Sequence, residues 1–229
     1  MFKGGVVTTF LLLVTAQGAS AQKWDAPLFF SPRPMDDIGA YYVSSNRCCG
    51  FDNSNGLKLI WRQSGNLNLG VHAGTGDLSN IGESILLGAE LYGPLSNIIR
   101  AGNLALSWSL GIGAAFGEDD DTQLSYMDFS VPVGVSVGIP IGTGSTTILP
   151  YIHPRVSFDV VAITDEATDV EETFTDVGFA ADLGAEVSLG QSLLVRAAYT
   201  FGSDSDETGK RDAFGIGVAL RMQRKVIVR

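Results

Sequence analysis

The fold is decided by the stretch from Phe129 to Ile141, which reads FSVPVGVSVGIPI. Every odd-numbered position in it holds a large apolar residue, and every even-numbered position holds Ser, Gly or Pro. Successive side chains of a β-strand point to opposite faces. The alternation therefore predicts a strand with one apolar face and one face of very small residues.

The same period of two recurs along most of the chain. It is regular over 104–116, 177–189, 193–201 and 214–222, and shorter or rougher over 57–63, 67–73, 84–92 and 146–163. A barrel whose first and last strands meet with both chain ends on one side needs an even number of strands, and 38–44 is the best candidate to complete the set. We predict an all-β fold, an antiparallel up-and-down transmembrane β-barrel of ten strands. Eight strands remain the alternative if 57–73 forms a separate hairpin.

The chain begins with the pattern of an export signal. Lys3 precedes a short apolar stretch at 6–14, and Ala19-Ser20-Ala21 fits a cleavage site. We therefore expect a signal peptide at 1–21 and a periplasmic lead-in at 22–35. The barrel is expected at 36–222, followed by a short basic tail at 223–229.

Net charge and hydropathy argue against a nucleic-acid-binding protein and against a membrane-spanning helix after the signal. The formal net charge is −10 over 229 residues, and nucleic-acid binding needs clustered Lys and Arg. After the signal no run of about 18 apolar residues is present, so no membrane-spanning helix is expected. The chain holds 28 glycines, many of them inside alternating segments, where they indicate a crowded inner face or the bends that closure requires.

Period two alone does not say which face of the barrel meets water. A soluble exported barrel that binds a lipid has the same alternation with its faces reversed. Here the apolar face lacks charge and the other face is rich in Gly, Ala and Ser, which favours an apolar face toward lipid and a narrow lumen. Charges of both signs fall on the lumen register and are expected to pair there: Lys58, Arg62, Glu90, Asp128, Arg155, Asp159, Asp182, Glu186, Arg196 and Arg221.

Acidic residues gather in the segments expected to be long outer loops, 74–83, 117–123, 164–172 and 202–211. Clustered carboxylates attract divalent cations, which are a candidate partner at Asp119-Asp120-Asp121. No spacing matches a defined calcium loop. The simpler interpretation is a set of solvated loops that keep the outer surface hydrophilic.

Cysteine and histidine supply the few residues with potential chemistry. Cys48 and Cys49 are adjacent, and in an oxidising compartment they form a loop-tightening disulfide or pair between molecules. They provide too few ligands for zinc. His72 and His153 both fall on the lumen register, and His153 near Ser157 or Asp159 is a candidate acid–base group. A hydrogen-bonded lumen histidine is the simpler interpretation, so we assign no catalytic, cofactor-binding or metal residue.

The alternation over 36–222 resembles that of small outer-membrane barrels of the OmpA-like, OmpW-like and opacity-protein kind. Such proteins end in a signal that the barrel-insertion machinery reads, and Gly217-Val218-Ala219-Leu220-Arg221-Met222 is similar to it, with Met222 where an aromatic residue is usual. The resemblance implies the outer membrane as location, and its lipid and the insertion machinery as partners. We expect a structural, surface-interaction or passive small-solute role without catalysis. The alternatives are a barrel-embedded hydrolase of envelope lipids or peptides and a soluble lipid-binding barrel.

Overall fold

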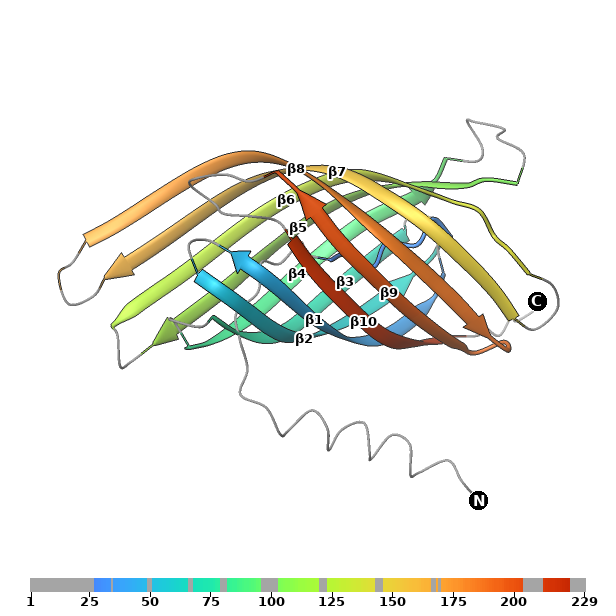
Figure 1. Cartoon of the computed structure of the whole chain (residues 1–229), viewed down its shortest axis with the longest axis horizontal. Coiled ribbons are helices and arrows are strands. Elements are labelled where there is room, and N and C mark those ends of the chain that lie inside the picture. Colours follow the sequence, from blue (N-terminus) through green and yellow to red (C-terminus); the bar gives the residue numbers. More distant parts are fainter. Residues whose placement is uncertain are drawn as a thin grey trace, which may run out of the picture.

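The computed structural model is a closed barrel of antiparallel strands (Figure 1). It describes residues 27–33, 35–48, 51–65, 68–78, 82–95, 103–119, 123–142, 146–165, 168, 170–203 and 212–222. The strands are β1 (Asp37–Cys48), β2 (Phe51–Gln63), β3 (Asn68–Leu78), β4 (Gly82–Pro94), β5 (Ala105–Asp119), β6 (Leu124–Gly138), β7 (Thr146–Asp165), β8 (Val170–Leu189), β9 (Leu193–Gly202) and β10 (Asp212–Arg221). Within these ranges no helix has the length and apolar character of a transmembrane span.

Each strand pairs with its neighbours in sequence, and β1 closes the barrel by pairing with β10. The closing register runs from Asp37 opposite Arg221 to Asn46 opposite Asp212. The prediction of ten strands is confirmed. The alternative of eight is wrong, because residues 57–73 contribute β2 and β3 to the wall instead of a separate hairpin.

Strand β6 shows how the alternation produces the two faces. Val133 and Val135 are exposed on the outside, whereas Ser130 and Ser136 are fully buried in the lumen. The strand ends at Gly138, three residues before the predicted end at Ile141, which makes only an isolated bridge to Ile148. Pro140 lacks the N–H that a continuing ladder would need.

The outer face of the barrel carries a continuous set of exposed apolar side chains. Leu59 on β2 and Phe179 and Leu183 on β8 are more than half exposed. The charged residues beside them point inward: Lys58, Arg62, Asp182 and Glu186. Exposed apolar surface of this extent is unfavourable in water. This orientation is the reverse of that in a soluble lipid-binding barrel, which keeps its apolar face inside.

The two ends of the barrel differ. We call the end at which β1 begins and β10 ends the inner end, and the opposite one the outer end. At the outer end β7 and β8, each 20 residues long, project well beyond β9 and β10, each 10 residues long (Figure 1). The segments expected to be long acidic loops are in part strand, because backbone pairing continues after the side chains become polar. Thus β3 continues to Leu78 and β5 to Asp119.

Candidate functional site

The lumen is filled with charged side chains. Nine of the ten residues predicted to face it are less than 5% exposed: Lys58, Arg62, Glu90, Asp128, Arg155, Asp159, Asp182, Glu186 and Arg196. Arg221, at the inner end, is half-buried. Asp37, the first residue of β1, is also fully buried among them. Sequence reasoning missed Asp37 because it lies one position before the predicted strand.

One cluster is centred on Arg196 of β9. Its guanidinium contacts Asp37 Oδ2 at 2.6 Å and Glu186 Oε2 at 2.7 Å, and it donates a hydrogen bond of 2.7 Å to the Tyr41 hydroxyl. Glu186 lies directly opposite on β8, whereas Tyr41 is two strands away in the other direction, beyond Gly217. Gly217 has no side chain, and the Tyr41 ring occupies the space where one would project.

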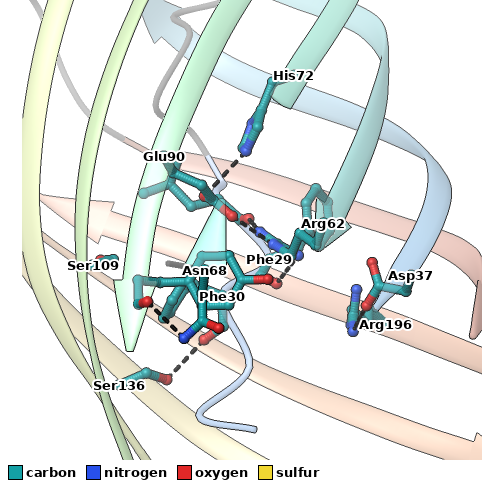
Figure 2. A network of polar contacts seen from close by, with 12 residues as sticks. Phe29, Phe30, Asp37, Arg62, Asn68, His72, Glu90, Ser109, Ser136 and Arg196 are labelled. Carbon is teal, nitrogen blue, oxygen red and sulfur yellow. Dashed lines mark hydrogen bonds and ion pairs between the residues drawn. The ribbon is translucent and has the colours of Figure 1, made fainter. Parts of the chain in front are cut away.

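A second cluster lies on β2, β3 and β4, and a glycine again separates two long side chains that meet. Arg62, Gly70 and Glu90 are successive cross-strand partners, and Glu90 reaches over Gly70 to Arg62, with Nε and Oε1 2.5 Å apart. The other carboxylate oxygen of Glu90 lies 3.0 Å from His72 Nε2 (Figure 2). A Cβ at Gly70 would stand 2.6 Å from the Glu90 side chain, so the glycine is what allows this pair to meet.

A third cluster is centred on Asp182 of β8. Its carboxylate accepts hydrogen bonds from Arg155 at 2.5 Å and from Thr200 at 2.6 Å. The Nδ1 atom of His153, the residue opposite it, lies 3.3 Å away. The other ring nitrogen, Nε2, is 2.9 Å from Ser109 Oγ. Ser109, His153 and Asp182 therefore form a linear series of polar contacts at the wall of the lumen.

This arrangement differs from the predicted partners of His153. Ser157 and Asp159 bond to each other, with Ser157 Oγ donating to Asp159 Oδ2 at 3.2 Å, and Ser130 donates to the same carboxylate at 2.5 Å. The hydrogen bonds of the His153 ring thus go to Ser109 and Asp182, and a role for Ser157 or Asp159 beside His153 stays a prediction. Ser157 and Asp159 share a face with His153 but lie four and six positions along the strand from it, whereas Asp182 is directly opposite His153 on β8.

The least expected feature of the lumen is a segment of the chain itself. Residues 27–33 precede β1 and were predicted to be part of a periplasmic lead-in, whereas the structure places Leu28, Phe29 and Phe30 inside the barrel, each at most 3% exposed. Residues 22–26 and 34 of the predicted lead-in lie outside the described residues, as does the predicted signal peptide. We call residues 27–33 the lumen segment.

The lumen segment is linked by hydrogen bonds to two of the three clusters. Arg62 donates hydrogen bonds to the carbonyl oxygens of Leu28 at 3.0 Å and Phe29 at 3.2 Å. The Leu28 N–H donates to Asp182 Oδ2 at 3.4 Å, and Ser136 Oγ donates to the Phe30 carbonyl at 2.7 Å (Figure 2). The charged wall and the lumen segment thus form one polar network.

The remaining sequence predictions concern residues at the outer end. Cys48 ends β1, but its side chain and Cys49 lie outside the described residues, so the predicted disulfide stays a prediction. Of the acidic residues, Glu118, Glu171 and Glu172 are exposed on strand extensions, and Asp120 and Asp121 are not described. Among the described residues no three His, Cys, Asp or Glu side chains are grouped as a metal ion requires. The basic tail at 223–229 is likewise outside them.

Several solved barrels are similar to this chain at low sequence identity. They include the attachment invasion locus protein Ail of Yersinia pestis (11% identity, TM-score 0.42, 83% of this chain and 100% of that chain). Neisserial surface protein A follows (12%, 0.41, 81% and 95%), as does the N-terminal β-barrel domain of Pseudomonas aeruginosa OprF (8%, 0.36, 83% and 100%). No curated protein matches the chain significantly.

A family model gives the stronger result. The model described as "Outer membrane protein beta-barrel domain" matches residues 61–221, from the last residues of strand β2 to the end of β10. The match agrees with the closed barrel, its exposed apolar outer face and its charged lumen. The chain belongs to the outer-membrane β-barrel family, and its location is the outer membrane.

Proposed function

We propose that this protein is a closed, non-conducting outer-membrane barrel that anchors in the lipid and presents its outer end for surface interactions, without catalysis. The observation that carries the proposal is the filled lumen. Three arginines, Arg62, Arg155 and Arg196, are each paired with a carboxylate inside the barrel. Leu28, Phe29 and Phe30 of the lumen segment are buried in the same lumen.

The network opposes the passage of ions and solutes. An ion crossing the lumen would have to displace Phe29 and Phe30 and separate buried pairs such as Arg196 and Asp37. Breaking a buried pair leaves an uncompensated charge and costs about 3–5 kcal/mol. Several such pairs in series make the closed state the stable one, which favours the structural and surface role over passive solute transport.

The outer end is the part available to partners. The strand extensions there carry exposed acidic residues, among them Glu118, Glu171 and Glu172. Acidic surface of this kind attracts cations and basic partners at long range. We assign the surface interaction to this end, with divalent cations as candidate ligands, and we expect the insertion machinery to engage the inner end during assembly.

The test of the closed state is single-channel recording of the refolded full-length protein in planar bilayers. Insertion is verified first by the heat-dependent change in gel mobility that folded barrels show. We expect no steady current from the inserted protein. A stable conductance in the wild-type protein would overturn the proposal and support a solute pore.

One observation favours a second function, that of a hydrolase. Ser109 Oγ, His153 and Asp182 are joined in the order that activates a serine nucleophile. The ring of Phe30 packs on His153, with centroids 5.2 Å apart, so a substrate reaches Ser109 only when the lumen segment is displaced.

This second function is tested with a fluorophosphonate probe, which labels activated serines. The folded wild-type protein and Ser109→Ala are treated alike, and the labelled residue is located by mass spectrometry. Labelling at Ser109 that Ser109→Ala abolishes would support a hydrolase. The Phe30→Ala variant, in which the packing of the lumen segment is weakened, is treated in the same way. If Ser109 is labelled in neither protein, the three residues form a structural network without hydrolase activity.

A further inference from the structure

We propose that the barrel lumen is a binding site for a short apolar peptide, and that the lumen segment is its ligand, bound in cis and separable from the wall. The inference rests on the proposed closed state, because it identifies what closes the barrel. It goes further in assigning a ligand class to the lumen: a peptide recognised through its backbone and through two adjacent aromatic rings.

Recognition of the backbone comes from side chains of the wall. Arg62 donates to two successive carbonyl oxygens, those of Leu28 and Phe29. Ser136 donates to the next carbonyl, that of Phe30, and Asp182 accepts from the Leu28 N–H. Three consecutive carbonyl groups are thus bound by wall residues from β2 and β6, on opposite sides of the lumen. Such contacts recognise the backbone of a peptide more than a particular sequence.

The two aromatic rings occupy separate places. Phe29 stacks on Tyr41 with ring centroids 4.2 Å apart. Phe30 packs edge-on against Tyr92 at 5.6 Å and lies beneath the Arg62 guanidinium, 5.5 Å from its ring centroid. Aromatic pairs and a desolvated cation over a ring each add to the energy of burial. The wall therefore favours peptides that carry two adjacent aromatic residues over peptides that lack them.

Glycines of the wall make room for the ligand. A side chain at Gly215 would collide with the Phe29 ring and would stand 2.9 Å from Pro27 Cγ. At the other end of the lumen segment, a side chain at Gly138 would stand 2.9 Å from Pro32 Cγ. The interior surface is thus complementary to the segment where it enters and where it leaves.

The lumen segment is held by the wall without being part of it. It belongs to no strand, and the backbone hydrogen bond described within it, from Ser31 N to Phe29 O, is internal to the segment. Phe29 has a φ of 51°, a left-handed conformation that costs a residue with a side chain about 1–2 kcal/mol. Release relieves this strain and leaves the strand ladder intact, so the segment is separable.

The experiment uses the full-length protein with both rings removed, Phe29→Ala with Phe30→Ala, folded in detergent micelles. A dye-labelled synthetic peptide with the sequence of residues 26–33, APLFFSPR, is titrated and its fluorescence anisotropy recorded. We expect saturable binding to the double variant and little binding to the wild-type protein, whose site is occupied. A peptide with alanine at both Phe positions should bind about tenfold more weakly or worse, since a tenfold change corresponds to only about 1.4 kcal/mol.

A second variant acts from the barrel side. Gly215→Val fills the space of the Phe29 ring, so it should expose residues 27–33 to proteinase K while the wild-type segment stays protected, with cleavage mapped by mass spectrometry. Phe158→Ala removes a ring on the lipid-facing side and is the matched control, which should leave the segment protected. Absence of peptide binding by the double variant, or equal protection in all three proteins, would overturn the proposal.

These results are separate from the test of the proposed function. A wild-type protein that conducts ions contradicts the closed state, whatever the peptide does. A silent wild-type barrel whose double variant fails to bind the peptide keeps the closed state and removes the binding site.

Discussion

At the level of single residues, glycines determine which charges meet. Gly70 lies between Arg62 and Glu90, and Gly217 lies between Arg196 and Tyr41. In each case a long side chain crosses the strand that has no side chain to obstruct it. At these two positions, the glycine is explained by a pair of residues two strands apart.

The Arg196 cluster gives a prediction at this scale. Arg196→Met leaves Asp37 and Glu186 buried without their cation, and we expect the free energy of unfolding to fall by about 3–5 kcal/mol. The measurement is urea unfolding of the protein in lipid vesicles. The triple variant Arg196→Met, Asp37→Asn, Glu186→Gln should lose less than the single variant, because no unpaired charge remains. An equal or larger loss in the triple variant would contradict a charge-pairing role.

At the level of elements, the projecting part of β8 has one paired edge. Strand β9 pairs with β8 only from Ala180 onward, so residues 170–178 bond to β7 on one side and have no strand of the described residues on the other. The same stretch of β7 is paired on both sides, with β6 reaching Asp165. In the β7–β8 hairpin, the outer part of β7 is therefore an internal control for the outer part of β8.

Native-state hydrogen exchange tests this difference. We expect alternate amides of Val170–Gly178 to exchange much faster than those of Val160–Thr164, because N–H groups on the free edge have no partner in the ladder. Exchange is followed by mass spectrometry on the folded protein in micelles. Equal protection of the two strands would mean that another segment or molecule covers the β8 edge.

The elements also differ in whether they could be predicted from the sequence. Alternation is a local property, so Phe129–Ile141 was sufficient to predict most of β6 and its two faces, although the strand begins at Leu124 and ends at Gly138. The lumen segment has no such signal: it is short, rich in proline and without alternation, and the carboxylate that accepts the Leu28 N–H is 154 positions away. Likewise Ser109 and His153 meet only because β5 and β7 both flank β6, which depends on register and not on local sequence.

At the level of the whole molecule, stability depends on closure between the two ends of the barrel domain. Strands β1 and β10 pair over ten residues, and Ile216 lies near the middle of β10, opposite Tyr42 on β1 and Ala197 on β9. A closed barrel in lipid has no free edge, so every ladder N–H in this seam needs its partner. A local defect at the seam therefore affects the entire barrel.

Ile216→Pro is the variant that tests closure. Proline removes one N–H from the seam and introduces a ring where both neighbours are paired, so we expect a large loss of the folded, heat-modifiable gel band after refolding into vesicles. Ile216→Ala keeps the ladder and removes only lipid-facing apolar surface, so most of the band should remain. If Ile216→Pro folded as well as Ile216→Ala, then β10 would be a dispensable edge strand, and the barrel would be held by its other nine strands and by the charged network within them.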